Sequence, residues 1–193
     1  MGLWETLTGR TRPKQANLDS LFLVPSAAVT LQTAAGLLPT GDGSVCFRAA
    51  PGMAFQQVQD EVVALLDGDP DAPDVQTTRD SYGYTWLVAH RDPTGPDGIS
   101  GLCTDLHAVN TTLEAQGFGP GLLCSVVPFA DAAGHRVGLV YLYKQGTFYA
   151  FAPDGEPSRD NLLEIHVRDT LAGELPMEQD LSRWLALWGA PGL

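Results

Sequence analysis

The sequence predicts an α+β fold: a twisted antiparallel β-sheet with helices packed mainly on one face. Three apolar strand patterns follow one another without a helix between them, at residues 122–129, 136–144 and 147–151. Segments with apolar residues at helical spacing lie before and after this run. The chain has 193 residues, of which 44% are hydrophobic and 18% charged, so it can bury a core of its own. A run of consecutive strands with the helices placed before and after it is typical of an antiparallel sheet covered by a layer of helices.

Helical spacing and helix stop signals predict the helices. A short helix is expected at residues 17–23 and ends before Pro25, and a second runs from Ser26 to about Ala35, with Gly36 as its stop. The same spacing predicts helices over residues 55–66, 99–113 and 160–171. It also predicts a last helix that carries Leu181, Trp184, Leu185 and Trp188.

Two strands are expected ahead of the three-strand run. The first is "GSVCFR", residues 43–48, and the second begins at Tyr82, after an acidic, proline-bearing loop at residues 67–74. In "DSYGYTWLVAHRDP" the rings recur at every second position, so they share one face of the strand. This window is interpreted as a core strand, with an exposed aromatic docking surface as the alternative.

A hairpin joins the last two strands through Gln145-Gly146. The link fits either a tight two-residue turn or a type I turn with Gly146 in a bulge. If the turn closes on two residues, Leu142 faces Tyr149. An antiparallel sheet can leave one face open, and Tyr and Trp are enriched at interfaces. The candidates for contacting a protein partner are therefore Tyr82, Tyr84, Trp86, Tyr141 and Tyr143.

The chain divides into a basic N-terminal segment, residues 1–16, and a single α+β domain, residues 17–193. The segment begins with a small apolar cluster followed by bases, which is typical of a membrane-surface or docking segment; a frayed or core-docked terminus is the alternative. Its candidate residues are Leu3, Trp4, Leu7, Arg10, Arg12 and Lys14. With no apolar leader and no run near the roughly 18 apolar residues of a membrane span, a cytoplasmic location is expected, and the N-terminal segment leaves open a peripheral position at the inner face of the membrane.

Charge and motifs exclude several function classes. A net charge of −12 with only 11 Lys and Arg argues against nucleic-acid binding. The chain has no Walker loop, no dinucleotide-binding loop and no H-E-x-x-H, and its four histidines are too scattered to indicate a metal site. No cofactor or metal is therefore expected. The three cysteines form no C-x-x-C and are interpreted as buried thiols.

One pair of residues leaves an enzymatic alternative. Cys103 and His107 can meet at i,i+4 on one helix, which gives the hypothesis of a small cytosolic hydrolase. Asp105 cannot orient His107 from two residues before it. The sequence therefore favours a non-enzymatic binding module with no catalytic residues.

Several stretches together resemble a known family, the proteins named for association with phage shock protein A (PspAB). They are "LFLVPSAAVTLQTAAG", "GSVCF", "DSYGYTWLV", "TDLHAVN", "GFGPGLLCSVV", "VYLYKQGTFYAFAP", "RDN" and "WGAPGL", spread over residues 17–193. The resemblance implies an accessory or adaptor of the membrane-stress response built around phage shock protein A, a coiled-coil membrane-binding effector. That effector or its associated proteins would be the partner. The family has no established enzymatic activity, so no catalytic residue is carried over. The layout of elements is also similar to the type III secretion chaperone-like fold, an analogy of fold alone.

Overall fold

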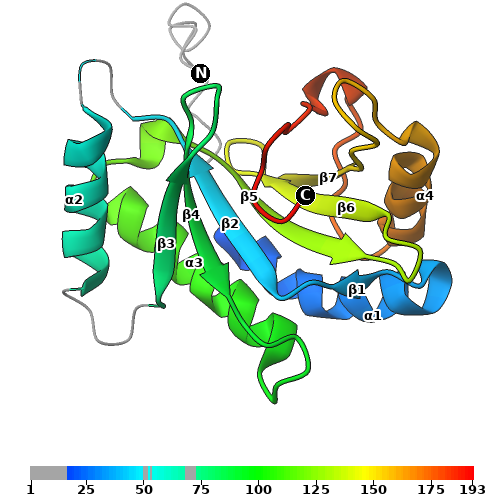
Figure 1. Cartoon of the computed structure of the whole chain (residues 1–193). Coiled ribbons are helices and arrows are strands. Elements are labelled where there is room, and N and C mark those ends of the chain that lie inside the picture. The colour runs from blue at the N-terminus through cyan, green and yellow to red at the C-terminus, as the bar shows by residue number, and fades with distance from the viewer. Residues whose placement is uncertain (1–16, 50–51, 53, 68–72) are drawn as a thin grey trace, which may run out of the picture.

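The computed structural model describes residues 17–49, 52, 54–67 and 73–193, and the predicted basic segment lies outside them (Figure 1). The described residues form one seven-stranded sheet with the order β3-β4-β2-β5-β6-β7, and β1 pairs with β5 beside this path. Every strand pairing is antiparallel. The strands are β1 (Leu38–Pro39), β2 (Asp42–Phe47), β3 (Val75–Arg79), β4 (Thr85–His90), β5 (Leu122–Ala130), β6 (Arg136–Leu142) and β7 (Thr147–Phe151). The α+β prediction is confirmed.

Helices cover one face of this sheet, which we call the helix face (Figure 1). The helices are η1 (Leu18–Leu23), α1 (Val24–Ala35), α2 (Phe55–Asp67), α3 (Gly98–Ala115) and α4 (Asn161–Leu171), and short 3₁₀ turns are η2 (Gly119–Gly121) and η3 (Leu181–Arg183). Alternate strand residues point toward the helices because side chains change face at each step along a strand. Val45, Leu139, Leu31, Leu106 and Val167 belong to this core.

Helix α3 lies close against the middle of the sheet. Gly43 of β2 has no side chain, and a Cβ there would come within 3.0 Å of Leu102 and Leu106. The buried Asn110 amide donates to the hydroxyl of Ser125 on β5 at 2.9 Å, so a polar contact also fixes the helix in place.

The 3₁₀ helix η1 ends at Leu23, as predicted, but α1 follows at once at Val24, two residues before the predicted Ser26. Pro25 therefore belongs to a helix. It lies in the first turn of α1, where its missing amide proton leaves no helical hydrogen bond unmade. The helix ends as predicted at Gly36, which has a left-handed φ of 66°. Together η1 and α1, residues 18–35, are long and apolar enough to span a membrane by length and mean hydropathy (1.2). In the fold they pack against α3 and α4 as core helices.

The opposite face of the sheet, here the strap face, is crossed by the end of the chain. We define the C-terminal strap as residues 178–193; Figure 1 shows it in red, in front of β5 and β6. The prediction of a C-terminal helix is wrong, since the short 3₁₀ turn η3 is the one helical element in residues 178–193. The spacing of Leu181, Trp184, Leu185 and Trp188 resembles a helix. Leu185 and Trp188 instead contact the sheet, Trp184 bonds to the strap itself, and Leu181 is exposed.

Two strand predictions also change. The strand β3 was not predicted. It is an edge strand with polar residues Gln76, Thr77 and Thr78, so it lacks the apolar alternation that identifies a half-buried strand.

The hairpin between β6 and β7 closes on four residues, and Leu142 therefore pairs with Thr147, whereas the two-residue turn would pair it with Tyr149. Gly146, with φ of 69°, supplies the left-handed residue of this loop.

Candidate functional site

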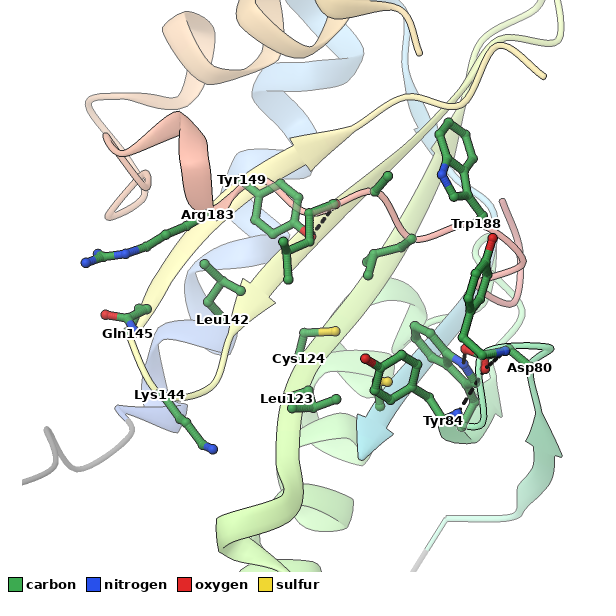
Figure 2. A pocket seen from close by; sticks show the side chains of 16 residues that line it. Asp80, Tyr84, Leu123, Cys124, Leu142, Lys144, Gln145, Tyr149, Arg183 and Trp188 are labelled. Carbon is green, nitrogen blue, oxygen red and sulfur yellow. Dashed lines mark hydrogen bonds between the residues drawn. The ribbon is translucent and has the colours of Figure 1, made fainter. Parts of the chain in front are cut away.

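A pocket of about 540 Å³ lies on the strap face, between the sheet, the β3–β4 turn, the β6–β7 turn and the strap. Figure 2 shows its lining, with Asp80 and Trp188 on one side, Leu142, Gln145 and Arg183 on the other, and Leu123 and Cys124 between them. This volume is in the range of cavities that hold small ligands or anchoring side chains.

One row of residues across four strands forms the floor of the pocket. Trp86 of β4 pairs with Cys46 of β2, Cys46 pairs with Cys124 of β5, and Cys124 pairs with Leu142 of β6. Residues directly opposite each other on antiparallel strands point to the same side of the sheet. All four therefore face the strap side, and all four line the pocket.

A β-bulge adds Leu123 to this floor. Phe47 pairs with Leu122 while the preceding Cys46 pairs with Cys124, so β5 carries one extra residue between the two pairings. Without the bulge, alternation would turn Leu123 toward the helices. Its side chain instead lines the pocket beside that of Cys124.

Asp80 holds the aromatic side of the pocket in place. Its carboxylate accepts hydrogen bonds from the backbone amides of Tyr82 and Tyr84, each at 2.9 Å, and from the indole Nε1 of Trp86 at 2.9 Å. Gly83, with φ of 86°, allows the turn that brings these donors together. One side chain thus fixes both the β3–β4 turn and the orientation of the indole.

The strap forms the outer wall through a few directed contacts. The hydroxyl of Tyr149, on the sheet, donates to the carbonyl of Leu185 at 2.9 Å. Arg159 donates to the carbonyl of Trp184 at 2.9 Å and pairs with the buried Glu164 at 2.8 Å. The ring of Trp188 meets Phe151 edge-on, with centroids 5.0 Å apart.

Lys144 lines the pocket, and the exposed Arg48 lies outside the lining, against the ring of Tyr84. Lys144 donates from Nζ to the carbonyl of Pro120 at 3.0 Å. The guanidinium of Arg48 lies 5.1 Å from the centroid of the Tyr84 ring and donates to its hydroxyl at 3.2 Å. Among the described residues neither cation forms an ion pair, whereas Arg183 pairs with Glu178 and Asp180. The pocket therefore combines apolar walls with Lys144, a cation that has no carboxylate partner in the part of the chain that the structure describes.

The aromatic candidates from the sequence divide between the two faces. Tyr82, Tyr84 and Trp86 all line the pocket, although Trp86 itself is buried. Tyr141 and Tyr143 lie on the helix face within the core, and burial raises the pKa of each to about 12. The structure thus brings three of the five together. The N-terminal candidates Leu3, Trp4, Leu7, Arg10, Arg12 and Lys14 lie outside the described residues.

Other pocket residues had no signal in the sequence. Cys46 and Cys124 are 78 positions apart, and only the pairing of β2 with β5 brings them face to face. The strap residues were expected to form a helix, so their place over the sheet was not predicted either.

Cys103 and His107, the hydrolase pair, lie on α3 away from this pocket. Cys103 is fully buried in the helix-face core, and burial raises its pKa to about 12, so little thiolate is present at neutral pH. His107 lies 3.6 Å from the carboxylate of Asp19 and stacks near the ring of Phe22. These contacts give the hydrolase hypothesis no support, and it stays a prediction.

Comparison with known proteins gives one match. No curated protein and no solved structure matches the chain. The family model described as PspAB, PspA associated protein B, matches residues 1–192. The description links the family to the PspA system, and at this coarse level to a protein partner. Because the match covers the whole chain but its final residue, the chain belongs to the PspA associated protein B family.

Proposed function

We propose that this protein is a non-enzymatic adaptor of the PspA membrane-stress response and that it binds a protein partner in the strap-face pocket. The family supports the connection to PspA. The observation that carries the proposal is the pocket itself: an apolar, aromatic hollow of about 540 Å³ on the strap face of the sheet. The partner is the PspA homologue or a protein associated with it.

The chemistry of the pocket defines the kind of segment that fits it. Leu123, Leu142 and Trp86 offer apolar contact to one or two large aliphatic or aromatic side chains. The exposed cations of Lys144, in the lining, and Arg48, beside Tyr84, favour carboxylates next to those anchors, because each can form a charge-assisted hydrogen bond with a carboxylate on binding. An acidic segment with apolar anchors therefore suits the site. The protein as a whole has a net charge of −12, so this basic rim is a local exception that favours one orientation of the partner.

Isothermal titration calorimetry with the PspA homologue of the same organism tests the proposal. The wild-type chain should bind at micromolar concentration. Leu142→Asp places a carboxylate on the pocket floor, and we expect it to abolish binding. The matched control is Leu162→Asp, since Leu162 is 85% exposed on α4, on the other side of the molecule. No heat with the wild-type chain, or equal binding by both variants, would contradict the proposal.

A second variant pair tests the basic rim alone. Lys144→Glu should weaken binding by at least about tenfold, the size of about 1.4 kcal/mol, because it reverses the charge that faces the partner carboxylates. Arg168→Glu reverses a charge on α4 that is paired with Asp169 and should leave the affinity unchanged. An equal loss in the two variants would show that net charge, and not the pocket rim, controls binding.

We further propose that the adaptor works in the cytoplasm, with residues 1–16 contacting the inner membrane surface. The support is the sequence pattern of apolar Leu3, Trp4 and Leu7 before three bases. Flotation with anionic liposomes tests it on the full chain. We expect Trp4→Ala, and reversal of Arg10, Arg12 and Lys14 to Glu, to reduce flotation. Flotation equal to that of the wild-type chain would contradict this part of the proposal.

A further inference from the structure

The two cysteines on the pocket floor point to a modification site. We propose that Cys46 and Cys124 form a reversible cross-strand disulfide when the folded protein meets a peroxide-class oxidant. This proposal does not depend on partner binding. It concerns two thiols that the fold places face to face and that the pocket connects to solvent.

The register of the sheet sets the geometry. Cys46 and Cys124 are direct partners on the antiparallel strands β2 and β5. Directly opposed residues have Cα atoms about 4.5–5.5 Å apart, and disulfides accept Cα distances of about 4.4–6.8 Å. The side chain of Cys124, followed by burial, raises the pKa of Cys46, which agrees with two sulfurs in close proximity. A disulfide therefore needs rotation of side chains and no movement of the strands out of the sheet.

Access distinguishes this pair from the third cysteine. Cys46 and Cys124 are nearly buried by area, but both line the pocket, which is wide enough for a small oxidant. Cys103 lies in the helix-face core with no exposed area and has no cysteine opposite it among the described residues. The same chain thus provides an internal control thiol.

The chemistry balances with hydrogen peroxide as the oxidant. Because the raised pKa of Cys46 keeps its thiol protonated, the thiolate of Cys124 attacks the peroxide, the O–O bond breaks, and the products are a sulfenic acid and water after proton transfer. The second sulfur then attacks the sulfenic sulfur, the S–S bond forms, and a second water leaves. Two thiols lose two protons and two electrons in total, and the peroxide is reduced to two waters. A small-molecule dithiol reverses the change by thiol–disulfide exchange.

Peptide mapping after oxidation of the folded full-length chain tests the proposal. The protein is treated with hydrogen peroxide at mildly alkaline pH, where more thiolate is present, and its far-ultraviolet circular dichroism is followed to confirm that it stays folded. Remaining thiols are then alkylated under denaturing conditions. We expect one free thiol of the original three, a peptide linked through Cys46 and Cys124, and full reversal by dithiothreitol.

Variants separate this result from non-specific oxidation. Cys103→Ala should form the same linked peptide at the wild-type rate. Cys46→Ala and Cys124→Ala should each keep both of their thiols under conditions that consume the wild-type pair. Retention of all three thiols in the oxidised wild-type protein, a disulfide that involves Cys103, or a disulfide that forms only when the dichroism shows unfolding would each overturn the proposal.

Discussion

The two faces of the sheet bury similar side chains but are covered in different ways. On the helix face, α1, α3 and α4 present regular apolar stripes that interdigitate with alternate strand residues. On the strap face, an irregular segment touches the sheet at separate points, among them Tyr149, Arg159 and Phe151. The pocket lies between these points, and a second hollow of about 530 Å³ also borders the strap at Trp188 and Leu193.

This difference shows how one sheet can serve two purposes. Regular helices pack closely on a face, so that face provides stability. An irregular cover leaves volume that a partner side chain can take. Substitutions on the helix face should therefore change folding without changing the affinity of the folded fraction, whereas substitutions of Leu142 and Lys144 in the pocket lining should change affinity.

The largest expected effect is on the helix face. Leu106→Ala in α3 removes a fully buried side chain and should lower the free energy of unfolding by about 2–5 kcal/mol. Unfolding in urea, monitored by circular dichroism, measures the loss in the free energy of unfolding. Partner affinity, corrected for the folded fraction, should not change. A loss well below 1 kcal/mol would mean that the core relaxes around the cavity, and the contrast between the faces would fail.

The next effect concerns the anchor of the strap. Arg159→Ala leaves the Glu164 carboxylate buried without its cation and releases the carbonyl of Trp184. We expect a loss of about 3 kcal/mol, because removing one member of a buried ion pair leaves an uncompensated charge. Amide hydrogen exchange should accelerate across the strap before it does in α3. Arg168→Ala, which breaks a surface pair with Asp169, should cost at most about 1 kcal/mol. Equal losses of stability in the two variants would rule out the role of Arg159 in anchoring the strap.

A smaller change tests a single strap contact. Tyr149→Phe removes the hydrogen bond to the carbonyl of Leu185 and keeps the ring. The expected loss of stability is about 1 kcal/mol, and the strap near Leu185 should exchange its amide protons faster. If exchange there is unchanged, other contacts hold the strap and the pocket wall does not depend on this bond.

The smallest effect is a pH dependence at the start of the strap. Burial opposes ionisation of Glu178, but hydrogen bonds from the Asp180 amide, Thr147 and Arg183, with the charge of Arg183, outweigh it and lower its pKa. A lowered folded-state pKa gives stability that is complete above the unfolded value of about 4.3 and is lost as the pH falls below it. The fluorescence of the strap tryptophans should follow this loss. Glu178→Gln should remove this component of the acid transition, and an unchanged transition would assign it to other carboxylates.

Much of the fold could be predicted because its elements have strong local patterns. The amphipathic stripe of α3 and the alternation of β4 each appear in one continuous stretch of sequence. The polar edge strand β3 has no such pattern. The strap has a helical pattern that its separate contacts with the sheet override, with Gly189 and Pro191 close behind.

The pocket could be predicted only in part. The spacing predicted a strand from Tyr82 that would put Tyr82, Tyr84 and Trp86 on one face, but β4 begins only at Thr85. Tyr82 and Tyr84 reach the pocket through the β3–β4 turn, which their amides hold to Asp80. The position of Tyr141 and Tyr143 on the other face depends on how β6 aligns with its neighbours. The thiol pair depends on register between strands far apart in the chain, and the wall depends on the path of the strap. These are properties of tertiary structure, which local patterns do not determine.

Hydrogen exchange of the complex with the PspA homologue, read by mass spectrometry, tests the central claim most directly. If the partner binds in the strap-face pocket, amide protons in the β3–β4 turn, the β6–β7 turn and the strap near Leu185 should exchange more slowly in the complex. Those of α1 and α4 should not change. Protection confined to the helices, with none around the pocket, would contradict the account.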